Sequence, residues 1–264
     1  MTAPLLVERH GVVATLTLNR PGALNALDFT LMDALVDAAA DVAADDNLRV
    51  VVIRGAGKHF MAGGDLRTFA GELTKPPQQR NADFRHMIGR LHSAIEHFHR
   101  MPHPVVGQVH GAVAGFGLSL MNACDLVVAA DNAYFASAYR NIALTPDGGG
   151  SWSLPRLVGM RSAMEILLLA ERFDASRALE LGLVNRVVPA SELDAAVNTM
   201  VQSLATGPVM AIRSAKRLLR ASPGRTLSEQ LDAEAVSFGA CAGTADFVEG
   251  ITAFLEKRPA KFGG

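Results

Sequence analysis

Two hydrophobic periodicities alternate along the first part of the chain, one typical of strands and one typical of helices. Between Val12 and Leu18 threonines alternate with apolar residues, which predicts a half-buried strand that pairs with residues 5–9. Asp28 then precedes apolar residues spaced for one face of a helix, so it is the expected N-cap. Residues 49–54 contain four consecutive β-branched residues, as in a strand buried on both faces. Strand, helix and strand in this order predict a βαβ crossover.

The same reading extends to the C-terminus and divides the chain in two. Strands and helices alternate as far as residue 190, and only helices follow in residues 191–264. We therefore expect an α/β core followed by a helical section that cannot bury all its own surface. The polar Pro–Pro stretch at 74–79 is expected to be a loop. The predicted strands are 105–109, 125–129, 134–136 and 184–188, and the predicted helices are 81–100, 118–123, 152–159, 162–170, 176–181, 193–205, 209–221, 227–238 and 244–256.

Composition narrows the class of protein. Of the 264 residues, 49% are hydrophobic and 19% are charged, yet no uncharged apolar run approaches the length of a membrane span. The apolar excess favours subunit contacts and hence an oligomer. A net charge of −1 with scattered Lys and Arg argues against nucleic-acid binding. Two cysteines and an N-terminus without the features of a signal peptide favour a cytoplasmic protein.

The most informative stretch runs from His110 to Ser151 and contains two glycine-rich turns. The first opens an apolar helix at 118–123, and the second, Gly148–Gly150, follows Pro146 and Asp147. Glycines before a helix let the main chain approach a ligand and turn unpaired N–H groups towards it. A carboxylate facing such donors could move the proton of an enolate. Asp147 also has a purely structural alternative, as the N-cap of the following helix.

Other motifs are weaker. Gly57–Lys58 resembles a phosphate loop, but no Ser or Thr follows the lysine. Several histidines gather on the helix at 81–100, without the accompanying pattern of a zinc site, and are expected to form a solvated helix face. No metal is therefore predicted. The segment from Ala62 to Asp65 reads, taken alone, as a tight turn with Asp65 as the N-cap of the next helix.

Six motifs occur in an order that is specific when taken together. From about residue 5 to the C-terminus the chain resembles the crotonase, or enoyl-CoA hydratase/isomerase, superfamily. The resemblance implies a spiral of ββα repeats, C-terminal helices that pack in a homotrimer or a dimer of trimers, and an acyl-CoA substrate whose coenzyme A replaces any separate cofactor. The motifs are NRP at 19–21 with LNAL at 24–27, FMAGGDL at 60–66, PVV at 104–106 leading to HG at 110–111, CDL at 124–126, PDGGG at 146–150, and EGI at 249–251 with AFLEKR at 253–258.

By position, the resemblance assigns the backbone N–H groups of Gly64 and Phe116 to the thioester oxygen. Two fixed amides can stabilise an enolate without reorganising, although glycine turns also serve close helix–sheet packing. Phe254 and Lys257 are implied to approach the adenosine end of coenzyme A from an adjacent subunit, while Lys257 is equally an ordinary cation of a last helical turn. The remaining residues implied to contact substrate are Ala26, Ala62, Gly63, Asp65, Leu66, Ser119 and Tyr139.

The chain departs from the hydratase pattern at both catalytic glutamates, where it has Ser119 and Tyr139. Neither replaces a carboxylate as a base at neutral pH, and both are otherwise expected as cavity wall. The Pro-acid-Gly motif at Asp147 resembles the branch with Δ3,Δ2-enoyl-CoA isomerases and the epoxyphenylacetyl-CoA isomerase, in which that acid moves the proton. Burial beside Phe116, Tyr139 and Trp152 is expected to raise the pKa of Asp147. The sequence thus favours an acyl-CoA isomerase, with an unusual hydratase or a non-catalytic acyl-CoA-binding protein as alternatives.

Overall fold

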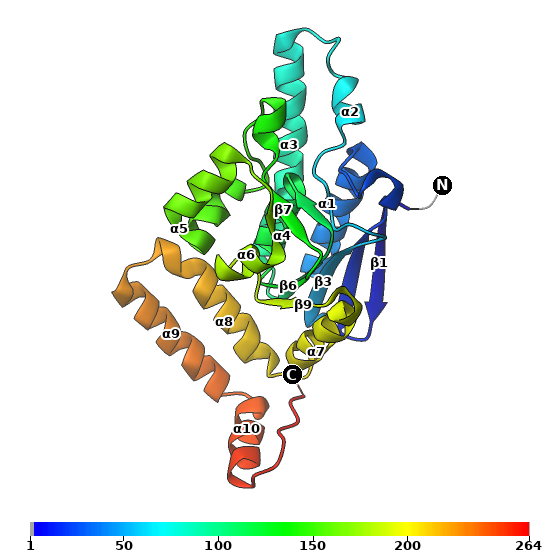
Figure 1. Ribbon diagram of the computed structural model, residues 1–264. Coiled ribbons are helices and arrows are strands. Elements are labelled where there is room, and N and C mark those ends of the chain that lie inside the picture. Colours follow the sequence, from blue (N-terminus) through cyan, green and yellow to red (C-terminus); the bar gives the residue numbers. More distant parts are fainter. Residues whose placement is uncertain (1–2, 264) are drawn as a thin grey trace.

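The computed structural model describes residues 3–263, which form two sheets covered by helices (Figure 1). The larger sheet has the order β1-β2-β3-β4-β6-β9, and the smaller has β5-β7-β8. Only β1 in the larger sheet and β8 in the smaller one run antiparallel to their neighbours. The strands are β1 Leu5–His10, β2 Val13–Leu18, β3 Val50–Gly55, β4 Val105–Val109, β5 Ala112–Ala114, β6 Leu126–Ala130, β7 Tyr134–Ala136, β8 Phe173–Asp174 and β9 Arg186–Val188.

The repeating unit places one strand in each sheet before a helix. β4 continues into β5 and then α4, and β6 continues into β7 and then α5. This is the expected α/β spiral of ββα repeats. The helices are α1 Phe29–Ala44, α2 Leu66–Ala70, α3 Pro77–Arg100, α4 Phe116–Ala123, α5 Gly150–Leu169, α6 Ala175–Glu180, α7 Leu193–Ala205, α8 Val209–Ala221, α9 Leu227–Ala242 and α10 Ala245–Leu255, with short 3-10 turns η1 Pro21–Ala23, η2 Tyr139–Ile142, η3 Ala190–Glu192 and η4 Ser222–Gly224.

The larger sheet is buried on both faces, which explains its β-branched runs. In β3, Val51 and Ile53 belong to the main core beneath α1, α3 and α4. Val50 and Val52 belong to a second cluster formed with α7. Successive side chains of a strand point to opposite faces, so a strand covered on both sides needs apolar residues at every position. The prediction for residues 49–54 is thereby confirmed.

Helices α8, α9 and α10 project from the core (Figure 1). Arg49, just before β3, ties both ends of this section to the sheet: its Nη1 donates to the carbonyl of Ala205 at 2.9 Å and its Nη2 to that of Gly263 at 2.6 Å. Asp125 ties α8 to the core by binding Lys216 Nζ and Arg220 Nη2, both at 2.7 Å. No helix in residues 3–263 is long and apolar enough to span a membrane.

Several predicted boundaries are wrong for identifiable reasons. The stretch at 74–79 is not wholly loop, because Pro77 begins α3, and proline is well suited to the first position of a helix. By contrast, the predicted break between helices 152–159 and 162–170 is confirmed, because Gly159 has a non-helical φ of 77° that divides α5. The helix predicted to end at residue 238 continues to Ala242. The N-caps Asp28 and Asp65 are confirmed, since they accept the N–H groups of Leu31 and Arg67.

Candidate active site

Two glycine turns from distant parts of the chain touch at the mouth of α4. Gly63 has a φ of 94° and Gly115 a φ of 53°, conformations that side chains rarely adopt. A Cβ on Gly115 would lie 3.3 Å from Gly63 Cα, and one on Gly63 would lie 3.2 Å from Ala114 O, so a side chain at either position would press on the other turn. The turns are held in register because Met61 N donates to Ala112 O at 3.0 Å, and Ala114 N to Met61 O at 2.9 Å.

This contact brings together Gly64 and Phe116, which follow the two turns. Phe116 is the first residue of α4, where N–H groups have no acceptor within the helix. Within residues 3–263, neither the Gly64 N–H nor the Phe116 N–H donates to a protein acceptor, and both residues line the same cavity. Two unpaired donors at the positive end of a helix suit an oxygen that gains negative charge.

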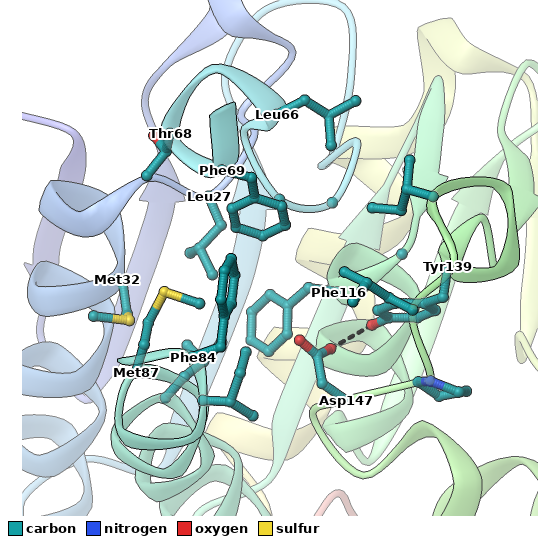
Figure 2. A pocket seen from close by; sticks show the side chains of 18 of the residues that line it. Leu27, Met32, Leu66, Thr68, Phe69, Phe84, Met87, Phe116, Tyr139 and Asp147 are labelled. Atoms are coloured by element: carbon teal, nitrogen blue, oxygen red, sulfur yellow. Dashed lines mark hydrogen bonds between the residues drawn. The ribbon is translucent and has the colours of Figure 1, made fainter. Parts of the chain in front are cut away.

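The cavity has a volume of about 600 Å³ and lies between α1, α2, α3 and the start of α4 (Figure 2). Seven residues expected at the site line it: Ala62, Gly63, Gly64, Leu66, Phe116, Tyr139 and Asp147. Its wall is mainly apolar, so a bound acyl group would be shielded from water. The apolar lining is Leu27, Met32, Leu66, Phe69, Phe84, Met87, Ile88, Leu91, Phe116, Ile142 and Leu144.

Two carboxylates line this cavity, and one of them is already engaged. Asp28 caps α1 and pairs with Arg20 Nη2 at 2.9 Å. Asp147 points towards the cavity near Phe116 (Figure 2), and its Oδ1 accepts a hydrogen bond from the Tyr139 hydroxyl. The chemistry available to the cavity is therefore that of one acid opposite two amide donors.

Burial raises the pKa of Asp147, and the hydrogen bond from Tyr139 opposes this only in part. Burial also raises the pKa of Tyr139, as does the neighbouring Asp147 charge, so the phenol keeps its proton. The expected direction for Asp147 is thus confirmed. Trp152 does not contribute as predicted: it lies outside the cavity lining, with its ring against His99 and Arg156.

The N-cap alternative for Asp147 is wrong. The N-cap of α5 is Gly149, in the left-handed region with a φ of 77°, and no side chain caps this helix. Asp147 lies two residues earlier, and its carboxylate turns back to Tyr139 of η2. Gly148, with a φ of 55°, reverses the chain between the two.

Five further residues expected at the site do not line the cavity. Ser119 is buried behind it, where its Oγ donates to the carbonyl of Asp147 at 2.8 Å. Ala26 is buried beside the cavity, and its carbonyl accepts from Arg20. Asp65 caps α2. Phe254 is exposed at the end of α10, with Lys257 just beyond it, on the opposite side of the molecule from α2 and α3 (Figure 1).

Arg20 and His92 have structural roles beside the cavity that the sequence motifs did not predict. Arg20 Nη2 lies 2.9 Å from both Asp28 and Asp65, so it joins the start of α1 to the start of α2 above the cavity. His92 lines the cavity from α3, and its Nε2 accepts the N–H of Gly148 at 3.2 Å. It therefore holds the loop that carries Asp147. Because α3 carries several histidines, the sequence does not distinguish His92 from the others.

Within residues 3–263 no cluster of three or more His, Cys, Asp or Glu side chains is arranged to bind a metal.

The profile of the enoyl-CoA hydratase/isomerase family matches residues 8–264. The chain belongs to this family. It is 36% identical over 252 residues to a probable enoyl-CoA hydratase of Rhodobacter capsulatus, covering 96% of this chain and 95% of the relative.

A second relative is named as an isomerase. The chain is 34% identical to the 1,2-epoxyphenylacetyl-CoA isomerase of Escherichia coli, again over 96% of this chain and 95% of that protein. The crystal structure of a putative enoyl-CoA hydratase/isomerase from Mycobacterium abscessus superposes with a TM-score of 0.93 at 32% identity, covering 98% of this chain and 99% of the other. The relatives of this chain within the family are thus named both as hydratases and as isomerases.

Proposed function

We propose that this enzyme is an acyl-CoA isomerase that moves a double bond, or rearranges an unsaturated ring, by proton transfer through Asp147. The observation that carries the proposal is that Asp147 is the one carboxylate of the cavity lining not engaged in capping a helix or in an ion pair. A 1,3-proton shift needs one base that can return the proton, whereas hydration needs a second group to activate water.

The proposed reaction has two proton steps. Ionised Asp147 takes a proton from carbon, so that a carboxyl O–H bond forms as the C–H bond breaks. With a 3-enoyl-CoA the proton leaves C2, and the freed electron pair delocalises into the thioester carbonyl to form a dienolate, whose oxygen the N–H groups of Gly64 and Phe116 bind. The pair then returns as the carboxyl proton passes to another carbon, and the product carries the shifted double bond. No separate cofactor is needed, because coenzyme A is part of the substrate.

The raised pKa of Asp147 suits this exchange, because a carboxyl whose pKa is nearer neutrality is a stronger base towards carbon. A positioned base of this kind contributes about 10²–10⁴ in rate. The apolar wall keeps competing water away from the dienolate. A hydratase with an unusual site is the second candidate, favoured by the name of the Rhodobacter capsulatus relative.

Asp147→Asn tests the proposal directly. With a 3-enoyl-CoA as substrate, we expect the variant to lose formation of the conjugated thioester, followed by its absorbance, while retaining fold and affinity for coenzyme A esters. Undiminished isomerisation by this variant would exclude Asp147 as the base. If the wild type hydrates crotonyl-CoA, the absorbance of the conjugated thioester is lost, and this outcome would favour the hydratase. If the wild type binds acyl-CoA esters tightly but turns over none of them, the result would favour the non-catalytic alternative.

We further propose a homotrimer or dimer of trimers, in which Phe254 and Lys257 reach the coenzyme A of a neighbouring subunit. Large apolar side chains on α9 and α10, such as Phe238 at 77% and Phe254 at 81% exposure, support subunit contacts. Phe238→Glu is expected to reduce the mass measured by light scattering, and an unchanged mass would argue against this interface.

Cys124 and Cys241 are both free thiols, which suits the expected cytoplasmic location.

A further inference from the structure

Asp147 is held through both its side chain and its main chain. The Tyr139 hydroxyl donates to the carboxylate Oδ1, and Ser119 Oγ donates to the carbonyl of Asp147 at 2.8 Å. Ser119 Oγ also lies 3.4 Å from the Tyr139 hydroxyl, so the two side chains contact each other as well as the acid. Figure 2 shows the Tyr139 hydroxyl meeting the carboxylate from one side, with the cavity on the other.

The main chain beside Asp147 is packed too tightly to shift. A Cβ on Gly148 would lie 2.9 Å from both Phe116 Cε2 and Ser119 Cβ, so the loop rests directly on α4. His92 Nε2 accepts the Gly148 N–H on the other side. Ser119 is 3% exposed, which removes water as a competitor for its hydroxyl. The backbone of residue 147 is thus fixed between α3 and α4.

The engagement of Oδ1 leaves the two oxygens of Asp147 inequivalent. A carboxylate that removes a proton from one carbon and returns it to another can do so without rotating if the same oxygen faces both carbons. Oδ1 already accepts from Tyr139, so Oδ2 is the more basic oxygen and has both lone pairs available for a proton from a ligand. A hydrogen bond to an ionised carboxylate also favours its charged form, which counteracts burial.

We propose that Tyr139 and Ser119 are positioning residues of the isomerase: Tyr139 occupies Oδ1 of Asp147 so that Oδ2 alone exchanges the proton, and Ser119 fixes the main chain from which the carboxylate extends. The inference rests on the proton transfer proposed for Asp147. It assigns a role to the two side chains that stand where a hydratase has its glutamates. It also explains how one acid can serve two carbons without a second carboxylate.

The groups that face Asp147 determine how the pH dependence must be interpreted. Tyr139 faces it from η2 and His92 from α3, while α4 presents the uncharged Phe116 and Ser119. Arg85 of α3 and Asp28 before α1 line the same cavity. Because activity needs ionised Asp147, kcat/KM rises with pH through the pKa of this residue. His92 is the other titratable side chain in contact with the loop that carries Asp147. The pH profiles of the variants are therefore also compared in a His92→Gln background, in which this group is absent.

The central test is the pH profile of kcat/KM in Tyr139→Phe. The variant keeps the ring and loses the donor, so the acidic limb is expected to move to higher pH by about one to two units, the equivalent of one hydrogen bond to a charged group. Ser119→Ala is the matched control: it loses the bond to the main-chain carbonyl, so kcat is expected to fall while the limb stays in place. A Tyr139→Phe limb at the wild-type pH would overturn the proposal.

A second measurement preserves the shape of the side chain. The protein has two tyrosines, so fluorotyrosine incorporated in a Tyr134→Phe background labels position 139 alone. Tyr134 lies outside the cavity lining. Fluorotyrosine is the stronger donor, so the limb is expected to move to lower pH, opposite to Tyr139→Phe. No movement, or movement in the same direction, would show that Tyr139 is only part of the cavity wall.

The two proposals fail in different ways. Isomerisation that survives Asp147→Asn removes the base, and with it any positioning role for Tyr139. Isomerisation that is lost in Asp147→Asn but has the wild-type pH profile in Tyr139→Phe leaves the base in place and overturns only the role of Tyr139.

Discussion

The ring of Phe69 lies directly against Gly64, since a Cβ at position 64 would come within 2.7 Å of Phe69 Cζ. The ring cannot withdraw freely, because it packs edge to face on Phe84 with centroids 5.1 Å apart. One of the two proposed oxyanion amides is thus in contact with the aromatic wall of the acyl cavity. The position of that amide and the packing of α2 on α3 are mechanically connected.

Gly64→Ala is therefore expected to displace this N–H group and to lower kcat/KM by about 10²-fold, the usual loss for a misplacement of about 1 Å. Steady-state kinetics with a 3-enoyl-CoA measures the effect. Phe69→Leu removes the atoms that a methyl group at position 64 would meet, so Gly64→Ala combined with Phe69→Leu is expected to recover part of the loss. No recovery would indicate that the ring is not the cause.

Gly148 and Gly149 provide a matched pair, because both have positive φ but different surroundings. A Cβ on Gly148 meets Phe116 and Ser119 at 2.9 Å, whereas the nearest atom to one on Gly149 is Ile95 Cγ2 at 3.9 Å. Both alanine variants carry backbone strain of about 1–3 kcal/mol, and Gly148→Ala adds an overpacking cost of about the same size. Thermal unfolding should show Gly148→Ala to be the less stable variant. Equal losses would contradict the packing described for this loop.

Asp147→Asn is expected to stabilise the fold even as it removes activity. The pKa of Asp147 is raised in the folded state, so folding favours the protonated form, and stability falls as pH rises from the unfolded pKa through the folded one. At pH 7 the native carboxylate therefore costs stability that a neutral amide does not. A gain of about 1 kcal/mol would raise Tm by about 2–4 °C. The gain should disappear below the unfolded pKa, and a gain that persists there would have another origin.

Phe84 belongs to the wall shared by the acyl cavity and a neighbouring one of about 360 Å³ between α1, α2 and α3. Phe84→Ala is expected to join the two and to raise kcat/KM for long acyl groups relative to short ones by about tenfold, the scale of one or more accommodated methylenes. Ile88→Ala is the control, since Ile88 lines the acyl cavity but neither this neighbour nor the cavity that adjoins it at Ile142. A panel of acyl-CoA esters gives both ratios. A similar change in both variants would show only a general enlargement.

The sequence predicted the parts of this molecule that depend on local pattern. The β-branched run at residues 49–54 required a strand covered on both faces, and Asp28 and Asp65 follow from the chemistry of helix capping. The order of motifs predicted which amides would face a ligand, and these two do line one cavity.

What the sequence could not show depends on turns without a local signature. Ala138, just before Tyr139, adopts a left-handed φ of 58°. A positive φ is uncommon for alanine, so the sequence does not predict the turn from which the Tyr139 hydroxyl reaches Asp147. His92 is one of several histidines on α3, and only the position of Gly148 distinguishes it. Trp152 follows the same loop in sequence, yet the rotation of α5 directs it to His99.

Arg49 gives the projecting helices an unusual attachment. The arm of α8, α9 and α10 begins next to Ala205 and the chain returns at Gly263, and one guanidinium binds the carbonyls of both. The arm is consequently tethered at both of its ends by Arg49, and along α8 by Asp125, rather than a free extension. A displacement of its two ends therefore acts through Arg49 on the residue just before β3, the strand whose far end leads into the glycine turn at Gly63.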